Sequence, residues 1–261
     1  MPGDDGAAPA GEDGPVTTTG LRRRSLGALA LRLTFASYNI HKAVGLDRRR
    51  DPDRILSVLR EIDADVIALQ ECDRRFGERE TVLPRQAIEE HTPWRIAPVA
   101  ERPLSMGWHG NALLVRRGLD IAATGHVRLP VIEPRGAVRA DLTLAGRRLR
   151  VVGMHLDISG VRRRQQVRCV LSHLDGCGRP LPAVLMGDLN DWTRQGRALR
   201  EFGEGWTLLA CGRSFPARRP VAQLDRIVVT GEWRVEAAGV HHSALAARAS
   251  DHLPVWARLS L

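Results

Sequence analysis

The stretch Pro182-Ala-Val-Leu-Met-Gly-Asp-Leu-Asn-Asp191 decides the fold prediction, because an apolar run ends there abruptly in carboxylates and an amide. Residues 182–186 have the composition of a short buried strand bounded by turn signals. Alternation along a strand sends Asp188 and Asn190 to the same side, and Gly187 permits a backbone approach that a side chain would block. A second interpretation is a strand followed by an Asx-type turn that caps a helix. The flanking segments decide between the two.

Upstream of this stretch, two predicted strands flank a predicted helix. Residues 31–40 alternate apolar and polar side chains, and residues 64–72 form an apolar run that ends in polar side chains. Between them, residues 51–62 begin with an Asp N-cap and a Pro and carry apolar side chains at helical spacing. This order predicts a βαβ unit that delivers polar groups at the carboxyl ends of both strands, where α/β folds bind ligands.

Downstream the pattern changes to many short strands with few helices. We expect strands at residues 110–117, 136–144, 147–156, 206–210, 224–230, 233–240 and 254–259, a hairpin turn at residues 144–147, and helices at residues 84–90, 161–174 and 193–202. Such a pattern predicts an α/β fold in which two sheets pack together with helices outside.

The chain is predicted to consist of a leader and one domain. The leader, residues 1–30, starts with a stretch rich in Gly, Ala, Pro, Asp and Thr, and we expect it to be disordered because nothing there offsets the ordering entropy. Its Arg-rich end could form one or two basic helical turns. No Pro/Gly/Ser linker divides the rest, so residues 31–261 are predicted to form a single domain.

Composition narrows the class of protein. The 261 residues contain 43% hydrophobic and 26% charged residues, as in soluble globular proteins. The net charge of +9 makes polyanions plausible partners, because arginine binds phosphate oxygens in a bidentate fork. The four cysteines show no C-x-x-C spacing, which favours a reducing cytoplasm. We expect no membrane span and no signal peptide, since the longest apolar run is too short and the first residues lack a basic start.

Polar side chains gather at the ends of the predicted strands, and this pattern points to chemistry. Taken singly, each has an ordinary interpretation, such as a turn, a surface acid or a core histidine. Together, the carboxylates would repel one another unless a cation or a proton lies between them. Carboxylate and amide oxygens without paired cysteines suit Mg²⁺ better than Zn²⁺. The residues concerned are Asn39, Glu71, His155, Asp188, Asn190, Asp225, Asp251 and His252.

These residues belong to seven motifs that carry a family resemblance. The motifs are Ser37-Tyr-Asn-Ile40, Leu69-Gln-Glu71, Gly110-Asn-Ala-Leu-Leu114, Met154-His-Leu156, Gly187-Asp-Leu-Asn190, Leu224-Asp-Arg-Ile227 and Ser250-Asp-His-Leu-Pro254. In this order they resemble the endonuclease/exonuclease/phosphatase superfamily, in particular its deoxyribonuclease, neutral sphingomyelinase and inositol 5-phosphatase branch. The resemblance covers residues 35–256. It implies a four-layer α/β sandwich with a Mg²⁺-dependent phosphoesterase site at one edge of the paired sheets, Mn²⁺ being an alternative metal.

The resemblance also implies roles for individual residues. The metal ligand would be Glu71, with Asn39 beside it and Asp251 close enough to contribute. Asp188 would orient and deprotonate the attacking water, and Asn190 would donate to the phosphate. These roles match what the hydrolysis of a phosphate ester requires, namely a positioned water and groups that absorb charge on the phosphoryl oxygens.

Two histidines complete the implied catalytic set. Asp225 would hold His252 in one tautomer, and His252 would bind or protonate the phosphoryl oxygens. His155 would contact the phosphate or assist the leaving group.

Three further residues are candidates for binding substrate. Arg135 matches a basic position of many such sequences, and Lys42, the only lysine in the chain, directly follows the first motif. For both, an exposed surface side chain is an equally good interpretation. Asn111 belongs to the third motif and is assigned to substrate binding on the resemblance alone.

The substrate class stays open at this level. Met154-His-Leu156 differs from the abasic-site endonuclease branch, whose equivalent strand usually supplies a Tyr and a Pro-Asn pair, and an aromatic content of 4% leaves few platforms for unpaired bases. Abasic-site repair is therefore disfavoured. DNA, RNA and phospholipid or inositol-type headgroups remain candidates, without a stable protein partner. Arg226 replaces a common aromatic and is expected to make the pocket more basic. The alternative function is a basic module that binds nucleic acid or membrane and has a vestigial site.

Overall fold

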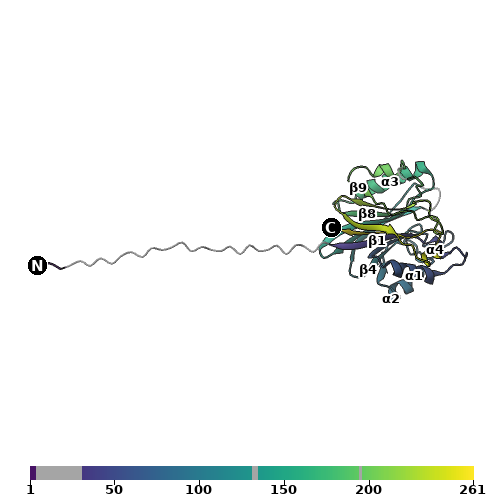
Figure 1. The fold of residues 1–261 in the computed structure, drawn as a ribbon, viewed down its shortest axis with the longest axis horizontal. Helices are drawn as coiled ribbons and strands as arrows, with labels where there is room; N and C mark the ends of the chain where they lie inside the picture. Colours follow the sequence, from purple (N-terminus) through teal and green to yellow (C-terminus); the bar gives the residue numbers. More distant parts are fainter. Residues whose placement is uncertain (4–30, 131–134, 194–195) are drawn as a thin grey trace. The chain divides into compact units, whose positions relative to one another are not determined.

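The computed structural model describes residues 1–3, 31–130, 135–193 and 196–261 (Figure 1). Residues Leu31–Leu261 form one compact unit. The expected disorder of the leader falls mainly on residues 4–30, which lie outside the described residues, so the division of the chain near residue 30 stays a prediction.

Two six-stranded mixed sheets form the centre of the domain. The first sheet has the order β11-β12-β1-β2-β4-β3 and consists of β1 (Arg32–Asn39), β2 (Val66–Gln70), β3 (Trp94–Ile96), β4 (Ala112–Arg116), β11 (Arg234–Val240) and β12 (Val255–Ser260). The second has the order β5-β6-β7-β8-β10-β9 and consists of β5 (Asp120–Val127), β6 (Gly136–Leu144), β7 (Arg147–His155), β8 (Ala183–Asp188), β9 (Trp206–Leu208) and β10 (Asp225–Thr230).

Helices cover the outer faces of both sheets (Figure 1). The first sheet packs against α1 (Pro52–Ile62), α2 (Arg85–His91) and the short α4 (Ala246–Ala249). The second packs against α3 (Gly160–Asp175) and the 3₁₀ turn η2 (Leu199–Phe202), and a further 3₁₀ turn, η1 (His41–Ala43), follows β1. The four-layer α/β sandwich predicted from the sequence is therefore confirmed.

The main core lies between the two sheets, where alternate side chains of facing strands meet. Phe35 and Val66 of the first sheet belong to the same buried cluster as Met186 and Ile227 of the second. The opposite faces of the same strands pack on the helices, which explains why the central strands are apolar on both sides.

Helix α1 forms as its sequence predicts. The Asp51 side chain accepts a hydrogen bond from the Arg54 backbone N–H at 3.0 Å, and Pro52 occupies the first helical position. Ile55 and Leu59 lie on its buried face. The βαβ unit from β1 to β2 is confirmed, since these strands pair in parallel.

The predicted helix at residues 193–202 is wrong in the part that the structure describes, where only η2 is helical. The Asp191 carboxylate explains this difference. Its Oδ1 accepts hydrogen bonds from the Thr193 backbone N–H at 3.1 Å and hydroxyl at 2.8 Å, and a Cβ on Gly196 would lie 1.9 Å from its Oδ2. Thr193 is therefore bonded to a buried carboxylate instead of starting a helix.

Two edge strands were missing from the sequence prediction. Strand β3 has only three residues, and β5 has the sequence Asp-Ile-Ala-Ala-Thr-Gly-His-Val, with little alternation of apolar and polar side chains. Both depend on pairing with a stronger neighbour, β4 and β6 respectively.

Candidate active site

The candidate site lies where four strands end at the same edge of the paired sheets. Strands β1 and β2 pair in parallel, as do β7 and β8, so their carboxyl ends point the same way. These ends carry Asn39, Glu71, His155 and Asp188. Strand β10 begins at this edge with Asp225, which lies opposite Asp188 in the antiparallel register.

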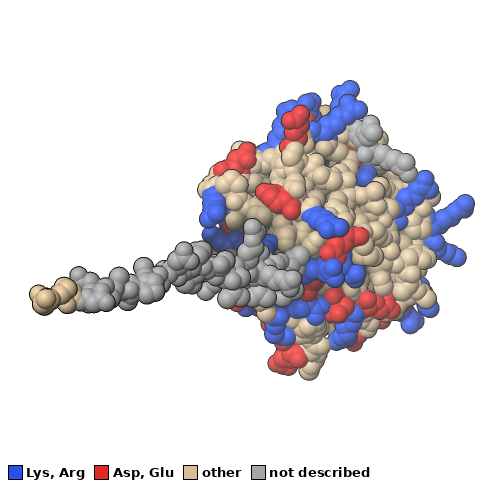
Figure 2. Space-filling model, turned by 60° about the vertical axis from the view of Figure 1, so that its left-hand side comes forward, with Lys and Arg blue, Asp and Glu red and all other residues tan. Residues whose placement is uncertain are grey.

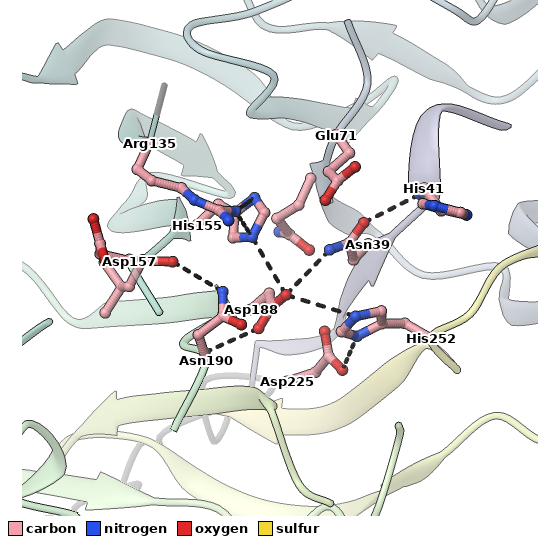
Figure 3. A network of polar contacts seen from close by, with 12 residues as sticks. Asn39, His41, Glu71, Arg135, His155, Asp157, Asp188, Asn190, Asp225 and His252 are labelled. Carbon is pink, nitrogen blue, oxygen red and sulfur yellow. Dashed lines mark hydrogen bonds and ion pairs between the residues drawn. The ribbon is translucent and has the colours of Figure 1, made fainter. Parts of the chain in front are cut away.

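The buried carboxylate of Asp188 is the centre of the polar network (Figure 3). Its Oδ2 accepts a hydrogen bond from Asn39 Nδ2 at 3.1 Å and lies 3.4 Å from His155 Nε2 and 3.7 Å from His252 Nε2. Its Oδ1 accepts the Asn190 backbone N–H at 2.9 Å. Burial alone would raise the pKa of Asp188, but His252 and His155 outweigh burial and hold this pKa well below its usual value. The group is therefore an anion that four neighbours orient.

The contact between Asp188 and Asn190 is itself an Asx turn, so the simpler interpretation of this stretch is correct about the turn. It is wrong about the helix that the turn would cap. Gly187 is needed as predicted, because a Cβ there would lie 1.8 Å from the carbonyl oxygen of Met154 on the neighbouring strand.

His252 and Asp225 form a second buried pair. His252 Nδ1 donates to Asp225 Oδ2 at 2.9 Å, and the Ser214 hydroxyl donates to the same oxygen. Burial disfavours a charged ring, but Asp225 and Asp188 outweigh it and raise the pKa of His252 to about 10. The ring is therefore protonated at neutral pH, and both of its nitrogens act as donors.

Glu71 occupies the more open side of the site. Burial would raise its pKa, but His155 and Lys42 act more strongly and lower the pKa of Glu71 to about 2. The Lys42 ammonium contacts the carboxylate directly. Asn39 Oδ1 accepts the backbone N–H of His41 at 3.1 Å, and Asp251 Oδ1 lies 3.9 Å from His41 Nδ1. Glu71, Asn39 and Asp251 thus lie around the end of β1.

The residues at the end of β1 fit a divalent cation. Glu71 is ionised, its carboxylate already has a cationic partner in Lys42, and Asp251 is about one third exposed. Carboxylate and amide oxygens are the donors that Mg²⁺ prefers. Asp188, Asp225 and His252 also have ligand atoms within 4.8 Å of one another, but this group includes an imidazole whose Nδ1 is already bonded to Asp225 Oδ2 at 2.9 Å. By donor type, the oxygen ligands of Glu71, Asn39 and Asp251 therefore suit Mg²⁺ better than the group that contains His252.

Arg135 joins the site through His155. Its guanidinium lies 2.8 Å from His155 Nδ1 and still closer to Nε2. The structure thus brings together every residue of the predicted catalytic and metal sets, and Arg135 and Lys42 with them.

Asn111 differs from the other predicted site residues. It is fully buried, and its Nδ2 donates to the carbonyl oxygens of Trp108 at 3.2 Å and His109 at 3.3 Å. These contacts fix the loop before β4, so the geometry favours a role in positioning that loop over the predicted contact with substrate.

Arg226 is also buried, and its guanidinium donates to the carbonyl oxygens of Asp191 at 3.4 Å and Thr193 at 3.1 Å. The expectation that it makes the pocket more basic is wrong. Consecutive residues of a strand point to opposite faces, so Arg226 points away from the side that Asp225 occupies.

Sequence reasoning missed part of the cleft beside Glu71 and His155. The further lining of this cleft includes Asp73, Arg74, Arg75, Arg79, His109 and Gly110. The available signal was the run Asp73-Arg-Arg-Phe-Gly-Glu-Arg79, which begins two residues after Glu71 and is dense in arginine.

The fold and the motifs agree with comparisons to known proteins. The family model described as Endonuclease/Exonuclease/phosphatase family matches residues 36–252. Among solved structures, an endonuclease/exonuclease/phosphatase family protein from Bacteroides thetaiotaomicron is similar with a TM-score of 0.72 and 21% identity, over 90% of this chain and 99% of that one. No curated protein matches this chain.

Two further solved structures are similar in fold. A mannosyl-6-phosphatase from Bacteroides thetaiotaomicron has a TM-score of 0.70 and 21% identity, over 88% of this chain and 100% of that one. D. rerio TDP2 complexed with single-strand DNA product has a TM-score of 0.68 and 16% identity, over 88% and 99%. Because the family model spans most of the folded sequence, this chain belongs to the endonuclease/exonuclease/phosphatase family.

Proposed function

We propose that this protein is a metal-dependent phosphodiesterase that hydrolyses its substrate by attack of water, with Mg²⁺ as the expected metal and Mn²⁺ as the alternative. The observation that carries the proposal is the buried Asp188 anion, which has Asn39, His155 and His252 within 3.7 Å and the Glu71 cleft beside it. Burial of an ionised carboxylate is costly unless charged and hydrogen-bonding partners surround it, and such groups with strongly shifted pKa values concentrate at functional sites.

Glu71, Asn39 and Asp251 would hold the metal. When bound, the metal supplies positive charge that stabilises the phosphoryl oxygens in the transition state. Lys42 already contacts Glu71, so it lies where it would interact with the same oxygens of the substrate.

The chain's own residues supply the remaining functions. Asp188 accepts a hydrogen bond from the attacking water and orients it, and the neighbouring Asn39 amide fixes the carboxylate that does so. His252, protonated and held by Asp225, donates a hydrogen bond to a phosphoryl oxygen. The Asn190 amide donates one hydrogen to the Leu156 carbonyl oxygen at 2.9 Å, and its second hydrogen would donate to the phosphate. His155, fixed by Arg135, is the candidate that assists the leaving group.

The substrate is proposed only as a class. Two similar folds are a mannosyl-6-phosphatase and a TDP2 bound to DNA product, which supports a phosphoester and leaves DNA, RNA and a phospholipid headgroup as candidates. The four cysteines are free, in keeping with a cytoplasmic location. In the described part of the chain, no helix has the length and apolarity to span a bilayer.

A basic module that binds polyanions is the competing function. Figure 2 shows that on one face of the molecule the basic and acidic side chains are interspersed and do not gather in a single basic area. Binding without turnover would fall steeply with salt and would not need a metal.

Hydrolysis of bis-p-nitrophenyl phosphate tests the proposal. We expect activity that appears with Mg²⁺, disappears with EDTA and is lost in Asp188→Ala and His252→Ala. Asp120→Asn, an exposed acid at the start of β5, is the matched control and should keep the activity. The proposed enzymatic function is rejected if there is no hydrolysis, if hydrolysis does not depend on the metal, or if both site variants keep it. A panel of plasmid DNA, RNA, sphingomyelin and phosphoinositides in the same assay then selects the substrate.

A further inference from the structure

The cleft beside the catalytic residues extends well beyond the groups that hydrolysis uses. We call it the arginine cleft, because Arg74, Arg75 and Arg79 line it together with His109. These residues come from the loops after β2 and before β4. A second hollow shares Arg79 and His109 with it, so the two residues lie between two open spaces.

Arg79 and His109 form a fixed pair at this position. Arg79 lies 2.9 Å from His109 Nδ1 and donates to it, which leaves the ring hydrogen of His109 on Nε2. Both residues have a left-handed backbone, with φ of 52° and 51°. Glu71 and Lys42 in the same cleft share this conformation, each with φ of 55°. Residues other than glycine keep such a backbone only where the surrounding structure imposes it, and they concentrate at functional sites.

The acidic residues of the cleft already have partners within the fold, so they do not neutralise its arginines. Asp73 is buried and bonded to the Ser105 hydroxyl and the Met106 backbone N–H, so its carboxyl is satisfied within the fold. Glu71 is paired with Lys42. Arg74 lies 3.3 Å from Glu80, but both side chains are about half exposed, and such a pair gives way readily to a stronger anion. The remaining surface of the cleft therefore attracts negative charge.

We propose that the arginine cleft binds a second phosphate group of the substrate, next to the phosphoester that the enzyme hydrolyses. The inference rests on the proposed function for the identity of the first phosphate. Arginines present paired N–H donors that match phosphate oxygens, and several of them around one cleft suit a doubly charged phosphate monoester better than a neutral group. The enzyme would then prefer substrates that carry an additional phosphate over simple diesters.

Binding of tripolyphosphate in EDTA, followed by isothermal titration calorimetry on the full chain, tests the cleft without catalysis. We expect Arg79→Gln to weaken binding at least about tenfold, as the loss of one charge-assisted contact predicts. Arg74→Gln serves as the second variant if Arg79→Gln does not fold. Arg234→Gln, an exposed arginine on β11, is the matched control and should bind as the wild type. Absence of binding, or equal binding by all variants, overturns the proposal.

Two pairs of substrates test the consequence for turnover and separate the possible sources of the phosphate. One pair is thymidylyl-thymidine with and without a 5′-phosphate, and the other is glycerophosphoinositol with and without a 4-phosphate. We expect the phosphorylated member of one pair to have a KM lower by about tenfold, and Arg79→Gln to abolish this ratio while Arg234→Gln keeps it. Equal KM values within both pairs, or a ratio that Arg79→Gln preserves, overturn the inference. If even bis-p-nitrophenyl phosphate is not hydrolysed, the proposed function fails, and the tripolyphosphate result alone decides about the cleft.

Discussion

His252 donates from Nδ1 to Asp225 Oδ2 over 2.9 Å, at a position almost closed to water. Asp225 and Asp188 together keep the ring charged against the cost of burial. The charge on His252 is therefore a property of this pair of carboxylates and can be changed through them.

Asp225→Asn should lower the pKa of His252 from about 10 towards its ordinary value, because the amide removes the charge that stabilises the imidazolium. NMR titration of the labelled histidines in metal-free protein measures this shift. Hydrolysis of bis-p-nitrophenyl phosphate should fall by about 10²-fold or more. An unchanged pKa of His252 in the variant, with Asp120→Asn as control, would show that Asp225 does not hold the charge.

The stability of the metal-free protein should depend on pH through the same residue. The pKa of His252 is raised on folding, so its contribution to the free energy of unfolding is complete below its unfolded pKa of about 6.5 and is lost as pH rises towards about 10. Urea unfolding in EDTA at pH 6, 8 and 10 should show this decline in the wild type and a flatter profile in His252→Gln. Parallel profiles for the two proteins contradict the prediction.

Glu71→Gln should raise the Mg²⁺ concentration needed for half-maximal activity by at least about tenfold, because an amide replaces an ionised ligand. A titration of hydrolysis with Mg²⁺ measures it. Glu232→Gln is the matched control, because it makes the same substitution at an exposed acid in the turn between β10 and β11. If both variants need the same Mg²⁺ concentration as the wild type, Glu71 is not a ligand.

Gly187→Ala should destabilise the fold, because the new Cβ would lie 1.8 Å from the Met154 carbonyl oxygen and would push β7 and β8 apart. We expect a loss of about 3 kcal/mol or more in the free energy of unfolding, from urea denaturation, together with a loss of activity. Gly231→Ala has no neighbour closer than 4.0 Å and should stay within about 0.5 kcal/mol of the wild type. Equal stability of the two variants would mean that the strands tolerate the side chain.

The sequence predicted the site residues best where a polar residue directly follows the apolar pattern of a strand. Polar residues directly after apolar runs placed Asn39, Glu71 and Asp188 at strand ends, and parallel pairing then brought those ends to one edge. His155 and His252 followed from the motifs that surround them, and the structure puts both next to Asp188.

Features that depend on distant contacts were not predictable in this way. The sequence after Asp191 looked helical, but in the fold the Asp191 carboxylate accepts the Thr193 backbone N–H and lies where a Cβ on Gly196 would clash with it. Arg79 and His109 lie thirty positions apart and meet because two loops converge beside Glu71. For Arg226 the sequence predicted a role in the pocket that the fold does not allow. Its guanidinium is buried and donates to the Thr193 carbonyl oxygen.

The hydrogen bond from Asn39 to Asp188 joins the first sheet to the second, and a Cβ on Gly153 would approach the Ala68 side chain to 3.0 Å further along the same interface. The spacing of the sheets is thus a mechanical constraint on the geometry of the proposed site. A substitution that thickens this interior contact would misalign Asn39 and Asp188 without touching either. Packing between the sheets and the geometry of the proposed site are therefore linked, so residues away from the site can alter it.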